Sequence, residues 1–275
     1  MAGTLYVVAT PLGNLGDLSP RAADTLKRVA VVAAEDTRHS KPLLNHAGSK
    51  AELISFHAHS SERALERILR ILTEGRDVAF ITDAGTPAIS DPGVALVAAA
   101  RERGIQVVTI PGPSAVAASL SVSGIGADRY VFLGFLPRKG SDRRRLLLTA
   151  AQSEWTVVIF EAPNRVTQLL ADLMEVCGPE RRAAVSRELT KVFEETRAGT
   201  LQELSELYAE APVRGEVTVV LSGTGKEHVE ERLPDPVERG KALLGEGLSR
   251  KDVVNRLVEE TGISRNAAYK LVNEL

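Results

Sequence analysis

Short runs of Val, Ile, Leu and Ala alternate with longer amphipathic stretches through the first half of the chain. This alternation is typical of a mostly parallel sheet covered by helices. It predicts strands at residues 5–9, 29–33, 53–56, 78–82 and 107–110. Ser19 is placed to cap a helix that begins at Pro20, and Ser61 precedes a second amphipathic helix. We therefore expect one α/β domain over residues 1–123.

A glycine-rich segment at residues 123–126 separates this series from a second one. The pattern beyond it predicts strands at 130–133, 156–160, 183–186 and 217–221, and helices over 143–151, 166–176 and 201–208. These elements predict a second α/β domain over residues 124–223. The order of its strands does not follow from the pattern.

A polar, proline-containing stretch over residues 223–236 reads as a linker to a small helical unit at 237–275. Ser249 with Asp252 and, further on, Ser264 are placed to cap two short helices, which predicts a helix-turn-helix-like unit. Residues 246–275 hold five basic and five acidic side chains. This balance leaves two interpretations open, a packing or dimerisation appendage and a nucleic-acid reader with a local basic face.

Composition narrows the class of protein. The 275 residues hold 34 Lys and Arg against 36 Asp and Glu, so any nucleic-acid contact must come from a local patch. Cys177 is the single cysteine, which excludes an intramolecular disulfide and a four-cysteine zinc site. The apolar runs are too short to span a bilayer, and we expect a cytoplasmic protein.

Three unusual loops follow predicted strands of the first domain, at the sheet edge where open α/β folds bind ligands. They span residues 10–17, 82–93 and 111–115, and all are rich in Gly and Pro. Such loops let the backbone approach a ligand closely. The sequence contains neither Gly-x-Gly-x-x-Gly nor Gly-x-x-x-x-Gly-Lys-Ser/Thr, which argues against a Rossmann dehydrogenase and a P-loop NTPase. We expect a pocket made largely of backbone.

The ordered motifs of the chain resemble those of the ribosomal RNA small-subunit methyltransferase I family, in the tetrapyrrole methylase superfamily. They read ATPLGNLGDLSPRA, AEDTR, FHAHS, TDAGTPAISDPG, PGPSA and FEAPNR. The resemblance implies two α/β domains with S-adenosylmethionine in the cleft between them. It also implies methylation of the ribose 2′-oxygen of a decoding-region cytidine in 16S ribosomal RNA, and a homodimer.

The resemblance also implies which residues contact the cofactor. By motif they are Pro11, Leu12, Asp83, Gly85, Thr86, Ile89, Ser114, Ala115, Phe160 and Glu161. Relatives that act on tetrapyrroles usually read Gly-Asp-Pro where this chain reads Gly85-Thr86-Pro87. This departure favours an RNA substrate over a porphyrin.

Methyl transfer to a ribose hydroxyl needs alignment and gains from a base or a cation near the oxygen. The candidates after the second strand are Asp36, with Glu35 and Arg38, and those after residue 186 are Glu188 and Lys191. Each could instead belong to a structural ion pair. We predict that Asp36 and Lys191 face the cleft and that substituting either lowers turnover more than cofactor affinity.

A basic cluster at residues 137–151 is the predicted RNA contact: Arg138, Lys139, Arg143, Arg144 and Arg145 stand against Asp142 alone. A solvated helix start is the alternative. His57 and His59 share one side of an extended segment, but without a third ligand at readable spacing we predict no metal site.

Three functions stay open at this point. The first is a 2′-O-methyltransferase that acts on small-subunit ribosomal RNA or on the assembled subunit. The second is a C-methylase of a tetrapyrrole precursor. The third is a nucleic-acid-binding regulator without catalytic activity.

Overall fold

The computed structural model describes residues 2–57, 62–91, 93–209, 214–224, 235–246, 248–261 and 263–275. Ser61, His59 and Pro92 lie outside these ranges, as does most of the predicted linker. The chain divides into two compact units, Met1–Thr224 and Gly225–Leu275, which are described separately. No helix within the described ranges has the length and apolar character needed to cross a membrane.

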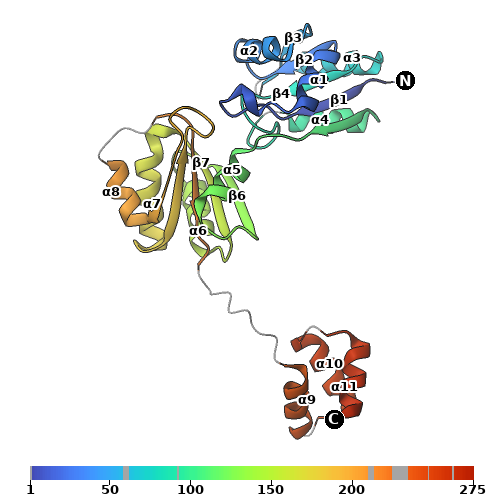
Figure 1. Cartoon of the computed structure of the whole chain (residues 1–275), viewed down its shortest axis with the longest axis vertical. Coiled ribbons are helices and arrows are strands. Elements are labelled where there is room, and N and C mark those ends of the chain that lie inside the picture. Colours follow the sequence, from blue (N-terminus) through green and yellow to red (C-terminus); the bar gives the residue numbers. More distant parts are fainter. Residues whose placement is uncertain are drawn as a thin grey trace. The chain divides into compact units, whose positions relative to one another are not determined.

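The first sheet is wholly parallel, with strand order β3-β2-β4-β1-β5 (Figure 1). Its strands are β1 (Thr4–Val8), β2 (Val31–Ala34), β3 (Glu52–Ser55), β4 (Val78–Ile81) and β5 (Gln106–Ile110). Every residue of β2 and β4 is buried, as expected for central parallel strands covered on both faces. The predicted strands are confirmed, with ends that differ by one or two residues.

Helices cover both faces of this sheet. They are α1 (Pro20–Arg28), α2 (Thr37–Ala47), α3 (Glu62–Thr73) and α4 (Val94–Glu102), and a 3₁₀ turn spans Leu15–Asp17. Leu26 of α1 and Leu44 of α2 share one core, whereas Leu69 of α3 and Leu96 of α4 share the other. The Ser19 hydroxyl accepts a hydrogen bond from the Ala22 amide, which confirms the predicted cap.

The second sheet is mixed, with order β6-β7-β10-β8-β9, and only β6 and β7 pair in parallel. Its strands are β6 (Tyr130–Phe135), β7 (Thr156–Glu161), β8 (Arg182–Arg187), β9 (Glu195–Thr200) and β10 (Val217–Leu221). Helices α6 (Ser141–Gln152), α7 (Val166–Cys177) and α8 (Leu201–Ala209) belong to its larger core, and a 3₁₀ turn spans Pro163–Arg165. Sequence patterning predicts four of these strands and misses β9.

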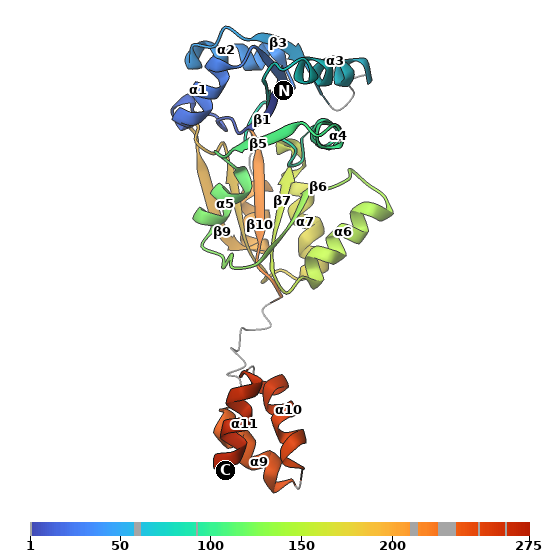
Figure 2. The ribbon, with the colours of Figure 1, turned by 90° about the vertical axis from the view of Figure 1, so that its right-hand side faces the viewer.

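Helix α5 (Ala115–Ser123) covers the other face of the second sheet (Figure 2). Its Val116 and Leu120 pack against Val158, Ala184 and Val220. The chain thus crosses from the first sheet to the second within residues 111–114, ahead of the predicted boundary. Ser114 occupies the N-cap position, but its side chain makes no capping hydrogen bond.

The second unit contains α9 (Pro236–Gly245), α10 (Arg250–Thr261) and α11 (Arg265–Glu274) around a small core. The Asp235 carboxylate accepts from the amides of Val237 and Glu238 at the start of α9. The predicted caps of the next two helices are confirmed. The Asp252 amide donates to the Ser249 hydroxyl over 3.3 Å, and the Ala267 amide donates to the Ser264 hydroxyl over 3.3 Å.

Candidate functional site

A cavity of about 300 Å³ opens within the first unit, where loops of the first sheet meet residues of the second. The first half of the chain contributes Leu12, Glu35, residues 82–84, residues 89–91 and Ala115. The second half contributes Phe135, residues 160–163, Leu189 and residues 215–218. A smaller hollow of about 50 Å³ shares Leu12, Ile89, Ala115 and Phe160 with it. Residues far apart in sequence therefore enclose one space.

The residues carried over by motif as cofactor contacts gather at these two hollows. The lining residues among them are Leu12, Asp83, Gly85, Thr86, Ile89, Ser114, Ala115, Phe160 and Glu161. Pro11 is buried beside Leu12 and lines neither hollow. The role of these residues in cofactor binding stays a prediction, but all of them except Pro11 line the two adjoining hollows.

Hydrogen bonds tie the three loops of the first sheet to one another. Thr10 and Gly85 exchange backbone hydrogen bonds of 2.9 and 3.1 Å, and the Thr86 hydroxyl donates to the Pro113 carbonyl over 3.1 Å. Gly85 has a φ of 80°, and an added Cβ would lie 3.3 Å from Leu12 Cδ2. A residue without a side chain suits both the backbone conformation and the close approach.

The loop over residues 82–93 holds a strained backbone. Ala88 and Ser90 have φ values of 67° and 60°, in the left-handed region that side chains disfavour. Gly93 has a φ of 127°, and a Cβ there would lie 2.1 Å from Cε1 of the buried Phe80 ring. Strain of this kind persists where surrounding structure enforces it, often at ligand-binding sites.

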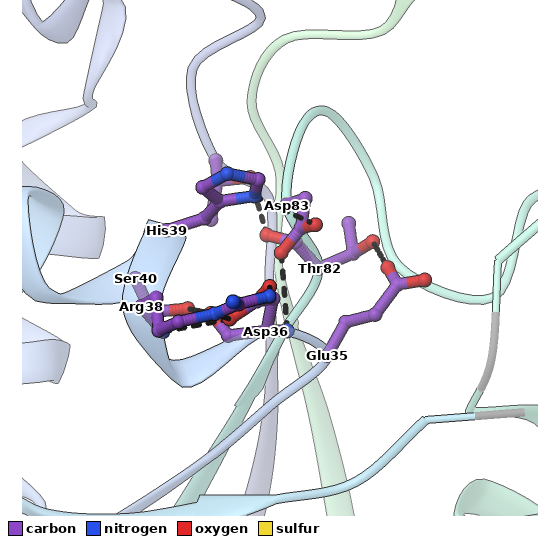
Figure 3. A network of polar contacts seen from close by, with 8 residues as sticks. Glu35, Asp36, Arg38, His39, Ser40, Thr82 and Asp83 are labelled. Atoms are coloured by element: carbon purple, nitrogen blue, oxygen red, sulfur yellow. Dashed lines mark hydrogen bonds and ion pairs between the residues drawn. The ribbon is translucent and has the colours of Figure 1, made fainter. Parts of the chain in front are cut away.

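Five acidic residues line the larger cavity: Glu35, Asp83, Asp91, Glu161 and Glu216. The Thr82 hydroxyl donates to Glu35 Oε2 over 2.7 Å, and Asp83 lies between the Asp36 amide and the His39 ring (Figure 3). Burial and the nearby Glu35 carboxylate raise the pKa of Asp91 to about 6. This concentration of negative charge suits a cationic ligand.

The raised pKa of Asp91 predicts a pH-dependent gain in stability for Asp91→Asn. The unfolded state holds this carboxyl near its ordinary pKa of 3.8, so ionisation costs folding free energy, and the cost grows between pH 3.8 and about pH 6 and is constant above that. The neutral amide removes this cost. We expect thermal unfolding at pH 8 to occur at a higher temperature in the variant than in the unaltered chain, with the difference shrinking toward pH 5. Asp17→Asn, on the exposed 3₁₀ turn, is the control; an equal difference at both pH values would contradict the assignment.

Asp36 takes a structural position rather than the predicted catalytic one. Its carboxylate caps α2 through the Arg38 amide and binds the Arg38 guanidinium over 2.7 Å (Figure 3). These hydrogen bonds hold the pKa of Asp36 well below its usual range, which makes it a weak base. It also does not line the cavity, whereas its neighbour Glu35 does.

Lys191 and Glu188 lie together beside the larger cavity. Lys191 Nζ contacts Glu188 Oε1 at 2.9 Å and Glu216 Oε2 at 3.2 Å. Burial lowers the pKa of Lys191, but hydrogen bonds to both carboxylates outweigh this and raise it, so the ammonium stays charged. An added Cβ on Gly13 would meet Lys191 Cγ at 2.4 Å, so the Lys191 stem packs on the first loop. Leu189 and Glu216 line the cavity itself.

The predicted RNA-binding cluster contains both exposed and buried side chains. Arg143 is the buried one, which contradicts its predicted contact with RNA. Its side chain is only 9% exposed, and its guanidinium donates to Asp172 over 2.5 and 2.8 Å and to the Pro137 carbonyl. It also lies 3.8 Å from Glu161, so it belongs to a buried ion-pair network. Arg138, Lys139 and Arg144 are exposed, and exposed Arg145 pairs with Asp142 at 3.5 Å.

Sequence reasoning missed Glu216, Phe135 and Pro163 as lining residues. Phe135 ends β6, Pro163 begins the 3₁₀ turn after β7, and Glu216 directly precedes β10. Only Pro163 lies in a quoted motif, FEAPNR. Of the two histidines considered for metal binding, His57 is described and His59 is not. Among the described residues, no three His, Cys, Asp or Glu side chains are grouped to hold a metal ion.

Comparisons with a family model and with individual known proteins agree on the kind of protein that this chain resembles. The model of the tetrapyrrole (corrin/porphyrin) methylases matches residues 4–205. The ribosomal RNA small subunit methyltransferase I of Synechocystis sp. is 43% identical, over 99% of this chain and 98% of its own. The protein of the same name from Pseudomonas aeruginosa is 44% identical, over 98% and 96%.

Solved structures support the fold. Uroporphyrin-III C-methyltransferase from Thermus thermophilus, complexed with S-adenyl homocysteine, superposes with a TM-score of 0.59 at 20% identity, covering 80% of this chain and 97% of that one. Cobalt precorrin-4 methyltransferase superposes with a TM-score of 0.62 at 17% identity, over 80% and 94%. These likenesses show the two-sheet methylase fold. Together with the full-length similarity to curated relatives, they show that the chain belongs to the ribosomal RNA small subunit methyltransferase I family.

Proposed function

We propose that this chain is an S-adenosylmethionine-dependent methyltransferase of small-subunit 16S ribosomal RNA, acting on the ribose 2′-oxygen of a decoding-region cytidine. The observation that carries the proposal is the shared cavity: family-motif loops of the first sheet meet residues 160–163 of the second. The curated relatives named ribosomal RNA small subunit methyltransferase I match this chain over nearly their full lengths.

The residues around the cavity fit the proposed cofactor in chemistry. S-adenosylmethionine carries a sulfonium and an ammonium, and five acidic residues line the walls. Leu12, Ile89 and Phe160 offer apolar contact for a planar base. When bound, the cofactor supplies an activated methyl group, so the protein has mainly to hold and orient it.

The 2′-hydroxyl must lose a proton during its attack on the methyl group. Side chains at the cavity are proposed to accept this proton and to stabilise the resulting negative charge. We propose that Asp91 accepts this proton. Asp91 lines the cavity, and burial together with the Glu35 carboxylate raises the pKa of Asp91 to about 6. Lys191 keeps its charge and contacts Glu216 at the cavity wall, and we propose that it stabilises the developing oxyanion. Glu188 orients Lys191 through the 2.9 Å contact. Of the catalytic residues proposed from sequence, Lys191 and Glu188 therefore retain support.

The remaining parts of the proposal concern partners and location. The exposed cations Arg138, Lys139, Arg144 and Arg145 are proposed to contact RNA phosphates. The target is the ribosomal RNA alone or the assembled small subunit, and the chain acts as a homodimer in the cytoplasm, where its substrate is. The division at residue 223 is likewise kept as a proposal, whereas the first boundary moves to residues 111–114, because α5 packs on the second sheet.

Transfer of a labelled methyl group tests the function. Small subunits from cells lacking this chain are incubated with the purified protein and S-adenosylmethionine, and nucleosides of the 16S RNA are analysed by mass spectrometry. We expect one 2′-O-methylcytidine per subunit. Transfer to a porphyrinogen in place of RNA would support the tetrapyrrole reading, and cofactor binding without transfer to either substrate would contradict the proposal.

A further inference from the structure

In the second unit, one face of α11 is polar and exposed and does not contribute to the core. On α11, Ala268 and Val272 are buried, whereas Arg265, Asn266, Tyr269, Lys270 and Asn273 are exposed. Successive positions in this set are one or three residues apart, so the five share one side of the helix. Figure 2 shows α11 beside α9 and α10 in this unit. The face offers two cations, two amides and a Tyr ring that is 45% exposed.

The ion pairs of the unit leave this face with unbalanced positive charge. Glu246 and Glu260 pair with Arg239, Glu238 pairs with Lys241, and Glu260 also pairs with Arg256. In contrast, Arg265 and Lys270 form no ion pair with any carboxylate that the structure describes. Residues 246–275 hold five basic and five acidic side chains, but the exposed face of α11 therefore has a local surplus of positive charge.

The position of Arg265 adds to that surplus. It is the first residue of α11, where the helix dipole is positive and disfavours a cation. Its guanidinium donates to Asn255 Oδ1 of α10 over 2.9 Å, which fixes its direction without neutralising its charge. Glu274, the one acid of α11, lies in the last turn of the helix. A bound phosphate would relieve the unfavourable charge at the helix start.

From this face we propose that α11 is a second RNA-binding surface, separate from the methyl-transfer cavity. Arg265 and Lys270 would contact backbone phosphates, and Tyr269, Asn266 and Asn273 would contact exposed bases by stacking and hydrogen bonds. The choice of RNA rests on the proposed function, which makes RNA the substrate. An acidic protein of the ribosome is the competing occupant, and it would need the cations but not the ring.

Binding of the full-length chain to RNA tests this surface. Arg265→Gln/Lys270→Gln removes both charges while keeping hydrogen-bonding groups, and Tyr269→Ala removes the ring. Affinity for protein-free 16S RNA and for small subunits is measured between about 50 and 200 mM KCl. We expect the double variant to bind about 10-fold more weakly and the slope of log K against log salt to become shallower by about 1.4–1.8, because two phosphate contacts are removed. Tyr269→Ala should weaken binding with an unchanged slope.

The matched control is Lys241→Gln/Arg256→Gln, which removes two ion-paired cations from the same unit. Circular dichroism melting checks that every variant folds, and Lys270→Gln alone serves if the double variant does not. Unchanged affinity and slope for both RNA probes, or no affinity of the unaltered chain for either, would overturn the inference. Loss on small subunits alone would assign the face to a protein instead. Failure of the proposed function is separate, because it appears as absent methyl transfer by the unaltered chain.

Discussion

Replacing Arg143 with Ala should destabilise the first unit by about 3–5 kcal/mol, because it removes a cation from the buried Glu161 carboxylate and from the partly buried Asp172 carboxylate. Glu161 is fully buried, and its Oε2 accepts no hydrogen bond. Two guanidinium groups stabilise it instead, Arg165 at 3.2 Å and Arg143 at 3.8 Å. Asp172 would also lose both of its bonds to Arg143. Urea unfolding followed by circular dichroism measures the loss.

Arg144→Ala is the matched control for this prediction. It removes the same side chain one position along α6, where the side chain is exposed. We expect unfolding within about 0.5 kcal/mol of the unaltered chain, together with weaker RNA binding. If Arg143→Ala were as stable as Arg144→Ala, the buried network would not be a stabilising feature, and the basic cluster would regain all its members as RNA contacts.

Replacing Ala115 with Trp should weaken binding of S-adenosylmethionine by at least about 100-fold, or about 2.7 kcal/mol. Ala115 lines both hollows at the start of α5, so an indole there would occupy the space proposed for the cofactor. The side chain of Ala115 is partly exposed rather than packed in a core, so the fold should tolerate the change. Isothermal titration calorimetry gives the affinity.

Ala117→Trp supplies the control, because it places the same ring on the same helix at an exposed position. Its affinity for the cofactor should stay within about twofold of the unaltered chain, a change of about 0.4 kcal/mol. Equal affinities of the two variants would mean that the cofactor binds elsewhere.

The fold was predictable wherever burial leaves a periodic signal in the sequence. Strands β2 and β4 are continuous apolar runs because both of their faces are covered. Strand β9 reads Glu195–Thr200, is polar and lies at the sheet edge, so its pairing with β8 leaves no hydrophobic pattern. Helix α2 carries Pro42 in its interior, which weakens its helical signal.

The site was predictable where its residues are contiguous in sequence. Residues 82–91 reach the cavity as one segment, whereas Glu216 and Phe135 reach it only through the packing of the second sheet. Arg143 shows how a charge run misleads. Helical spacing places it on the buried side with Leu147 and Ala150, while Arg144 and Arg145 turn outward.

The central claim is that the cavity between the motif loops and the second sheet holds the methyl donor. The most direct measurement is a crystal structure of the chain grown with S-adenosylhomocysteine, the product of transfer. We predict electron density for one molecule per chain in contact with Leu12, Ala115 and Phe160. Density at another surface, or an empty cavity at saturating concentration, would contradict the claim.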